Sequence, residues 1–270
     1  MAGNGTRGNH PEEGQRRLAV LIDADNAQAS VIEPLLAEVA RFGVASVKRI
    51  YGDFTSTRLQ QWKNVLLEHS IQPVQQFAYT SGKNATDSSL IIDAMDLMYT
   101  RRFDGFCLVT SDSDFTRLAQ RLREEGLTVY GFGEKKTPAA FRQACDTFIT
   151  TEVLRPAAPS ATPAPAEPAP AKKKANAKRA VAKAPEPKTE SLPPGLLALL
   201  RKAIDEASGD SKWAHLGAVG HYLNKVQPDF DARLYGSRKL SDLLKANPRH
   251  FALEERGQGE SKPLFVRWVD

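Results

Sequence analysis

The sequence predicts an α/β protein whose main domain contains a mostly parallel sheet, followed by a small winged-helix-like domain. Three observations support this fold class. Strand-like and helix-like segments alternate over residues 16–154, residues 155–193 are rich in Pro, Ala and Lys, and residues 194–270 combine helical patterns with a terminal hairpin pattern. Alternating strands and helices favour a parallel sheet joined by crossover helices. Residues 1–15 are expected to form a disordered tail.

The strands of the main domain are predicted from short apolar or alternating segments. LAVLID at residues 18–23 is apolar throughout and ends in a carboxylate, which is typical of a buried strand. Pro73 lacks an amide hydrogen, so the strand that contains it is expected to be weak. In chain order, the expected strands are 18–23, 45–52, 71–78, 103–110 and 127–133.

The helices of the main domain are predicted from apolar residues that recur every three or four positions. The strongest pattern covers residues 86–101. The expected helices are 27–41, 57–69, 86–101, 114–125 and the segment PAAFRQAC at 138–145. Right-handed crossovers would place the strand-to-helix loops at one edge of the sheet. Ligands of such folds bind beyond the carboxyl ends of the strands.

The remaining chain divides into a linker and a second domain. Ten of the 17 prolines fall within residues 155–194, so this stretch is expected to be an extended linker without a core. Beyond it, helices are expected at 194–207, 215–226 and 237–246. They are followed by the hairpin HFALEE–RGQGES–KPLFVRWV, with Gly257 and Gly259 in its turn. Helices closed by a two-stranded wing suggest a winged-helix arrangement.

Composition excludes several classes of protein. Apolar residues make up 41% of the chain, which argues against disorder over the whole chain. No apolar run is long enough to span a membrane, and the N-terminus lacks a secretory signal, so a cytoplasmic location is expected. The two cysteines cannot form a disulfide framework. The net charge of +5 comes largely from the linker, yet it suits a polyanionic partner.

Acidic side chains cluster at three places that the predicted fold brings to one sheet edge. Asp23 and Asp25 end the first strand and are followed by Asn26. Asp87 begins the strongest helix, and Asp112 and Asp114 follow the strand FCLVT, next to Ser111. Because helical periodicity places Asp87 on the apolar stripe of its helix, its side chain is expected to point toward the sheet. Asp93 lies to the side of that stripe and is kept as a supporting or structural residue.

The carboxylates in this arrangement predict a site for a hard divalent cation. Clustered carboxylates raise one another's pKa, and a cation relieves their repulsion. Mg²⁺ takes oxygen ligands and is held by a few carboxylates together with substrate phosphate. No His lies near the motifs, which disfavours zinc.

Each of these side chains also has a structural interpretation. Asn26 is equally expected as a helix N-cap, and Asp25 as a ligand or a cap. Ser111, Asp112 and Asp114 could cap the helix that follows them. Lys83 lies in a polar loop and is either a phosphate contact or a solvated side chain. The prediction therefore depends on the convergence of the three motifs.

These motifs resemble the NYN domain of the LabA-like group, which belongs to the PIN-like metal-dependent nucleases. The matching segments are LAVLIDADN, GKNATDSSLIIDAMDLM and FCLVTSDSDFTRLA, within about residues 16–154. The resemblance implies a PIN-like sandwich and RNA cleavage with Mg²⁺ or Mn²⁺. It implies that Asp23, Asp87 and Asp112 hold the metal and that Asn26 joins them as a catalytic residue. It also matches Ser111 and Asp114 to the family's serine-aspartate motif.

Residues 194–270 resemble an OST-HTH (LOTUS) domain, a class associated with RNA binding. DARLYGSRKLSDLL is the most telling stretch. Arg233, Tyr235, Arg238 and Lys239 offer cations and an aromatic ring near a helix N-terminus, which suits RNA. Leu240 and its apolar neighbours belong to the core, and Tyr235 could do so as well.

The sequence thus predicts a metal-dependent ribonuclease with an RNA-binding domain. Two alternatives stay open. One is a regulatory RNA-binding protein without catalysis. The other, ranked lower, is a phosphatase of the haloacid-dehalogenase type, in which Asp23 would be the nucleophile and Asp25 the acid. The expected partner is RNA, no membrane is expected, and a homo-oligomer is left open.

Overall fold

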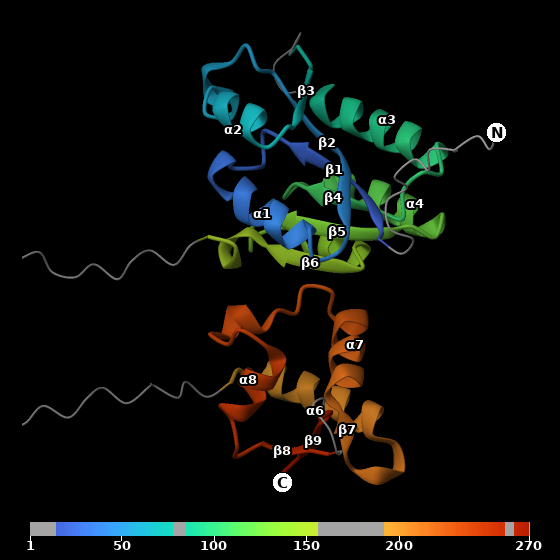
Figure 1. Cartoon of the computed structure of the whole chain (residues 1–270), viewed down its shortest axis with the longest axis vertical. Helices are drawn as coiled ribbons and strands as arrows, with labels where there is room; N and C mark the ends of the chain where they lie inside the picture. The colour runs from blue at the N-terminus through green and yellow to red at the C-terminus, as the bar shows by residue number, and fades with distance from the viewer. Residues whose placement is uncertain (1–14, 78–84, 156–191, 257–261, 270) are drawn as a thin grey trace, which may run out of the picture.

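The computed structural model describes residues 15–77, 85–155, 192–256 and 262–269. The described part of the chain forms two domains, which Figure 1 shows one above the other. The expected disordered tail, most of the linker, and Gly257 and Gly259 of the hairpin turn lie outside the described residues. No helix in the described ranges has the length and apolar character needed to cross a membrane.

The first domain is built on a six-stranded sheet in which every neighbouring pair of strands is parallel, as the alternating sequence predicts. The strand order is β3-β2-β1-β4-β5-β6. The strands are β1 (Arg17–Asp23), β2 (Val44–Gly52), β3 (Gln72–Gln75), β4 (Gly105–Val109), β5 (Thr128–Gly133) and β6 (Thr147–Thr150). The weak strand with Pro73 is indeed short and lies at the sheet edge, where a missing ladder donor is tolerated.

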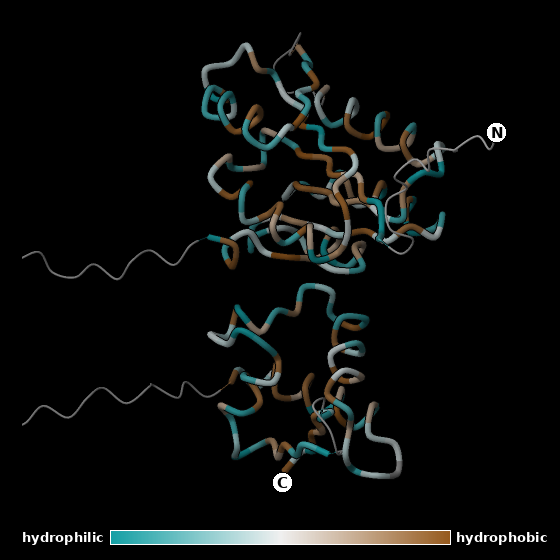
Figure 2. Tube along the Cα trace, viewed as in Figure 1, coloured by the Kyte–Doolittle hydropathy of each residue, from teal (hydrophilic) through white to brown (hydrophobic). Residues whose placement is uncertain are grey.

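Helices cover both faces of this sheet, giving three layers. They are α1 (Ile32–Val39), α2 (Trp62–Glu68), α3 (Ala85–Tyr99), α4 (Thr116–Glu124) and α5 (Ala139–Ala144). Successive residues of a strand point to opposite faces. Accordingly, Leu21 joins the core formed with α3, α4 and α5, whereas Ile22 joins the core formed with α1 and α2. Figure 2 shows hydrophobic residues following the central strands between the helix layers.

The order of the strands positions the candidate site. From β1, the chain proceeds outward to β2 and β3, and then returns to the other side of β1 as β4. In doubly wound sheets of this order, ligands bind at the carboxyl ends of the strands where the direction reverses. That reversal lies between β1 and β4, whose carboxyl ends carry Asp23 and the SDSD segment at 111–114.

The second domain contains three helices and a small antiparallel sheet. Its helices are α6 (Pro194–Ser208), α7 (Leu216–Val226) and α8 (Leu240–Lys245). The expected hairpin forms β8 (Phe251–Glu255) and β9 (Leu264–Trp268), and the short β7 (Ala214–His215) pairs with β9 to complete the sheet. Buried leucines from all three helices pack beneath Val266 of β9. This is the predicted arrangement of helices closed by a wing.

Two strands, β6 and β7, were not expected from the sequence, because they contain only four and two residues. Each is a strand only because it pairs with a neighbouring strand, β6 with β5 and β7 with β9. β6 pairs with β5 at the sheet edge, and the amide of Phe148 donates a 2.8 Å hydrogen bond to the carbonyl of Pro228 in the second domain. The second domain therefore satisfies part of the exposed edge of the first.

Candidate functional site

Asp23, the last residue of β1, is held in one orientation by three hydrogen bonds. Its side chain receives the backbone N–H of Asp25 at 3.0 Å, the Asn26 amide at 2.8 Å and the Thr110 hydroxyl at 2.8 Å. Asp23 is 0% exposed. Burial raises the pKa of its carboxyl, and the three donors oppose that rise because they favour the charged form. The result is an acidic group fixed beneath the site.

Asp87 lies in the first turn of α3 and faces the other acids of this sheet edge. One carboxylate oxygen from each of Asp87, Asp112 and Asp114 lies within 4.8 Å of the others. The pKa of Asp87 rises to about 6, mainly because of partial burial and then because of the nearby charges, that of Asp23 first and that of Asp112 second. The charges of these acids therefore act on one another at the same sheet edge, as the convergence of the motifs predicts.

Asp112 combines a structural role with a position in this acidic group. Its Oδ1 accepts the N–H of Asp114 at 2.9 Å and caps the short 3-10 helix η3 (Ser113–Phe115). Its own N–H donates to the Thr110 hydroxyl at 3.1 Å. The capping interpretation and the cation-site interpretation of Asp112 are thus compatible, because the cap fixes the loop that presents the carboxylate.

Ser111 stabilises the same edge without joining the acids. Its hydroxyl accepts the N–H of Glu134, the residue after β5, at 2.8 Å. This bond ties the loop after β4 to the loop after β5. Ser111 therefore has a positioning role in the geometry, rather than the helix-capping role considered from the sequence.

The structure distinguishes the two polar residues that follow β1. Asn26 caps no helix: its amide donates to Asp23, and the short 3-10 helix η1 (Ala29–Val31) is preceded by Gln28. The N-cap interpretation of Asn26 is therefore wrong. Asp25 is exposed, with Arg58 at 3.9 Å, and it influences the site through its charge.

Asp93 lies away from the acidic group and contacts β2. Its Oδ2 accepts the Tyr51 hydroxyl at 2.8 Å and pairs with Arg49 at 2.9 Å, both on β2. Asp93 thus anchors α3 to the sheet, and of the two roles considered for it the geometry favours the structural one. Lys83 lies outside the described residues.

Sequence reasoning missed Thr110, although this residue is central to the site. It is nearly completely buried, and it donates to Asp23 while accepting from Asp112. The only signal in the sequence was a hydroxyl residue at the end of a buried strand. Sequence reasoning also gave Asp114 a lesser place than the structure does, because spacing alone could not show that its carboxylate meets that of Asp87.

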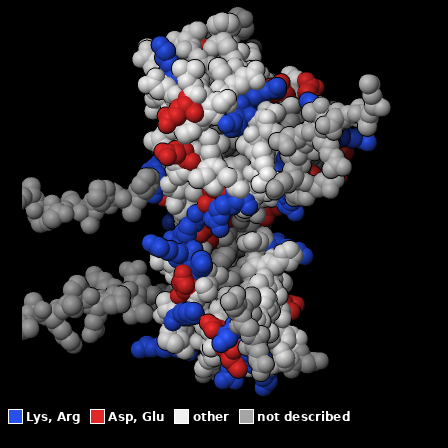
Figure 3. All heavy atoms as spheres, viewed as in Figure 1, with Lys and Arg blue, Asp and Glu red and all other residues white. Residues whose placement is uncertain are grey.

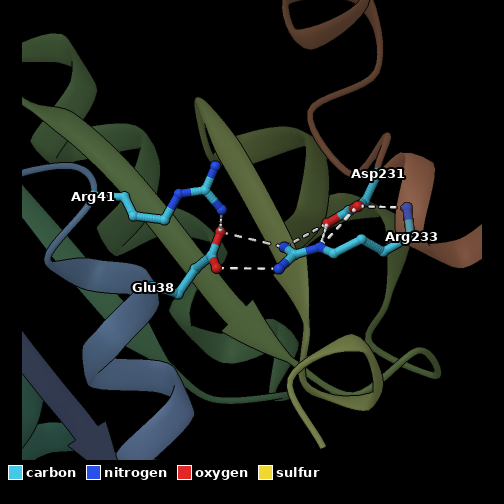
Figure 4. Close-up of polar contacts among 4 residues, drawn as sticks. All are labelled: Glu38, Arg41, Asp231 and Arg233. Carbon is cyan, nitrogen blue, oxygen red and sulfur yellow. Dashed lines mark hydrogen bonds and ion pairs between the residues drawn. The ribbon is translucent and has the colours of Figure 1, made fainter. Parts of the chain in front are cut away.

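Arg233, one of the predicted RNA contacts, lies at the interface between the two domains (Figure 4). Its guanidinium donates to Glu38 of α1 at 3.1 and 3.3 Å and to neighbouring Asp231 at 2.7–3.1 Å. Glu38 is almost buried and also pairs with Arg41 at 2.8 Å. A second ion pair between the domains joins Arg142 to Asp229. In this arrangement the charge of Arg233 is directed toward protein carboxylates.

Two of the other predicted RNA contacts line a cavity of about 310 Å³ at this interface. Arg238 and Lys239 line it from the second domain, and Arg41 lines it from the first. Figure 3 shows Lys and Arg side chains gathered at the waist between the domains. Tyr235 stacks on Phe230 at 6.2 Å and packs against the core, as its structural interpretation expected. RNA contact by these residues stays a prediction.

Three of the solved structures that resemble this chain match it over part of its length. A protein of unknown function from Vibrio parahaemolyticus matches with 16% identity over 52% of this chain and 96% of its own, with a TM-score of 0.44. An uncharacterised protein from Nitrosomonas europaea is 42% identical over 37% of this chain and 92% of its own, with a TM-score of 0.27. A protein fragment from Chromobacterium violaceum is 34% identical over 31% of this chain and 87% of its own, with a TM-score of 0.24. No curated protein matches the chain.

Protein-family models match both domains. The NYN domain model matches residues 17–153, about half of the chain, and the OST-HTH/LOTUS domain model matches residues 187–263. The first match contains the sheet and the acidic edge described above, and the second contains the three helices with β7 and β8 and ends just before β9. The chain therefore belongs to the NYN domain family and carries an OST-HTH/LOTUS domain at its C-terminal side.

Proposed function

We propose that this protein is a metal-dependent ribonuclease that hydrolyses RNA phosphodiesters with Mg²⁺ or Mn²⁺ at the acidic edge of the NYN domain. The observation that carries the proposal is the convergence of Asp87, Asp112 and Asp114 within 4.8 Å, beside the buried carboxyl of Asp23. The LOTUS domain supplies RNA binding. Joining the two domains in one chain raises the concentration of RNA near the acidic edge.

The donor set fits a hard divalent cation. All the ligand atoms on offer are carboxylate oxygens, which Mg²⁺ and Mn²⁺ prefer. Partial burial, and then the charges of the neighbouring acids, raise the pKa of Asp87 to about 6, and a bound cation would offset the cost of ionising this group. Asp87, Asp112 and Asp114 would hold the ion directly, with Asp23 next to them. A bound ion would supply Lewis-acid stabilisation of the phosphate and activate the attacking water.

The chain's own groups prepare the site for this chemistry. The hydroxyl of Thr110 and the amide of Asn26 keep the carboxyl of Asp23 oriented before RNA arrives. Asn26 is exposed and uses one amide hydrogen for Asp23. Its second amide hydrogen is therefore suited to a non-bridging phosphate oxygen of the substrate. Such preorganised donors contribute to catalysis because they need not reorient during the reaction.

The geometry is less favourable to the phosphatase alternative. A carboxylate nucleophile must reach the phosphorus atom with a free oxygen. The carboxyl of Asp23 is buried and accepts three hydrogen bonds, which occupy both of its oxygens. Asp25, the proposed acid of that mechanism, is exposed and lies near Arg58. Hydrolysis of a small phosphomonoester by the purified protein would be the result in favour of that alternative.

The proposal is tested by incubating the full chain with labelled single-stranded and structured RNA in Mg²⁺, Mn²⁺ or EDTA. Cleavage is expected only with metal. It is expected to fall by a factor of about 100 or more in Asp112→Asn and in the double variant Asp23→Asn with Asp112→Asn.

The matched control for this experiment is Asp96→Asn, because Asp96 is exposed on α3 and lies outside the acidic group. This variant is expected to retain full cleavage. Equal metal-dependent cleavage by Asp112→Asn and the wild type would exclude the proposed site. RNA binding without cleavage under every condition would favour the non-catalytic alternative.

A further inference from the structure

The wing of the LOTUS domain has an outer face that the core does not use. Val266 of β9 and Ala214 of β7 are buried and pair with each other. Because neighbouring residues of a strand point to opposite faces, Phe265, Arg267 and His215 lie on the outer side of the sheet. His215 and Arg267 are exposed, and Phe265 is partly exposed. This sheet lies on the side of the domain away from the NYN domain (Figure 1).

Two large aromatic side chains on this face are partnered by cations instead of by apolar groups. Trp213 and Phe265 do not belong to the hydrophobic core cluster of the domain, whereas Trp268 packs against it. The guanidinium of Arg256 lies 4.6 Å from the ring centroid of Trp213 and 5.1 Å from that of Phe265. That of Arg267 lies 5.1 Å from the ring centroid of Trp213. These rings therefore contribute little to core packing.

The face also carries surplus positive charge. Arg256 is paired with Glu254 at 2.9 Å. For Arg267, the described part of the chain offers no acidic partner within ion-pair distance. The ring of His215 meets Phe265 edge-on, with centroids 5.6 Å apart, and extends the aromatic row onto β7. The face thus presents flat rings interleaved with guanidinium groups, which can stack on aromatic rings and bind phosphate.

This combination suits one kind of ligand. Unpaired nucleotides offer a flat base to an aromatic ring and a phosphate to an arginine, and proteins that bind single strands use both contacts. The bases of a duplex are stacked on one another, so they cannot lie on such a face. An acidic peptide would satisfy the arginines but leave the row of rings without stacking partners.

We propose that Trp213, His215, Phe265, Arg256 and Arg267 form a stacking platform for single-stranded RNA on the outer face of the wing. The proposal deepens the RNA-binding part of the proposed function and rests on it. It places this contact away from Arg238 and Lys239, which lie at the domain interface.

The test measures binding by the full chain in EDTA, so that cleavage cannot interfere. The probes are a fluorescein-labelled oligouridine of about 12 nucleotides, a duplex of equal length, inorganic polyphosphate and polyglutamate. Trp213→Leu and Phe265→Leu keep apolar side chains but remove the flat rings, and thermal melting checks that both variants fold. Tyr99→Ala is the matched control, because Tyr99 is an aromatic residue 65% exposed on α3 of the NYN domain.

Each ring replacement is expected to weaken oligouridine binding about fivefold or more. It should change polyphosphate binding by less than about twofold, and Tyr99→Ala should change neither. The wild type should prefer oligouridine to the duplex. A folded Trp213→Leu variant with unchanged oligouridine affinity would overturn the platform, and so would equal losses for oligouridine and polyphosphate.

Three further outcomes also test the platform. Polyglutamate binding that depends on the rings, with oligouridine binding unaffected, would identify the face as an acidic-peptide site. Absence of oligouridine binding by the wild type would refute the platform as well. A ring-dependent loss of binding in EDTA together with a lack of cleavage in Mg²⁺ or Mn²⁺ would support the platform while rejecting the nuclease.

Discussion

Asp87→Asn is expected to make the metal-free protein more stable while abolishing its cleavage of RNA. The pKa of Asp87 rises from 3.8 to about 6, so the native fold bears a cost for ionising this group. For a fully buried group, that rise would correspond to about 3 kcal/mol. Asp87 is only partly buried, so solvent screens the interaction and reduces the expected gain to about 1 kcal/mol. For a domain of this size, the melting temperature should rise by about 3 °C.

The assay compares thermal melting of the two proteins in EDTA, together with RNA cleavage in Mg²⁺ or Mn²⁺. The pKa of Asp87 is higher in the folded state than in the unfolded state. The cost of ionisation is therefore complete above about pH 6 and absent below the unfolded pKa of 3.8. The gain from Asn should accordingly be present near pH 7.5 and fade as the pH falls toward 4.

The matched control is Asp96→Asn on the same helix, since Asp96 is exposed and is not among the charges that raise the pKa of Asp87. It should leave both the melting temperature and cleavage nearly unchanged. A melting temperature in EDTA that falls on replacing Asp87, or that rises equally with Asp96→Asn, would refute the argument that ionised Asp87 destabilises the native fold. Full cleavage by Asp87→Asn would remove this residue from the site.

Three further predictions concern the supports of the site and of the domain interface. Thr110→Val keeps the side-chain shape but leaves Asp23 without one donor. This variant should lower the free energy of unfolding, measured in urea, by about 1–2 kcal/mol and should slow RNA cleavage. An unchanged cleavage rate would exclude a positioning role for Thr110. Tyr51→Phe removes the hydroxyl bound to Asp93 and should cost about 1 kcal/mol in urea, with little effect on cleavage per folded molecule. Arg233→Met removes the ion pair with Glu38 and leaves the Arg142–Asp229 pair between the domains, so small-angle scattering should show a larger radius of gyration. An unchanged radius would mean that the other interface contacts suffice.

The pattern of apolar and polar residues along the sequence predicts most of the strands and helices. LAVLID became β1 because a continuous apolar run can be buried between two helix layers, and the helical pattern at 86–101 became α3. The strand order that brings Asp23 near Asp112 follows from right-handed crossovers, so the acidic edge was also predictable. β6 was not, because TFIT is too short to carry a period and becomes a strand only by pairing with β5.

The sequence by itself determined the two-domain α/β architecture and the edge at which the acids gather, since both follow from periodicity and from the handedness of connections. Only the tertiary structure decided which side chains meet there. It assigned Asp93 to Arg49 and Tyr51, and it directed Arg233 toward Glu38, 195 positions earlier in the chain. The physical reason is that hydrogen bonds and ion pairs depend on distances of a few ångströms. Spacing along a chain can place a residue on a face, but the packing of distant elements selects its partner.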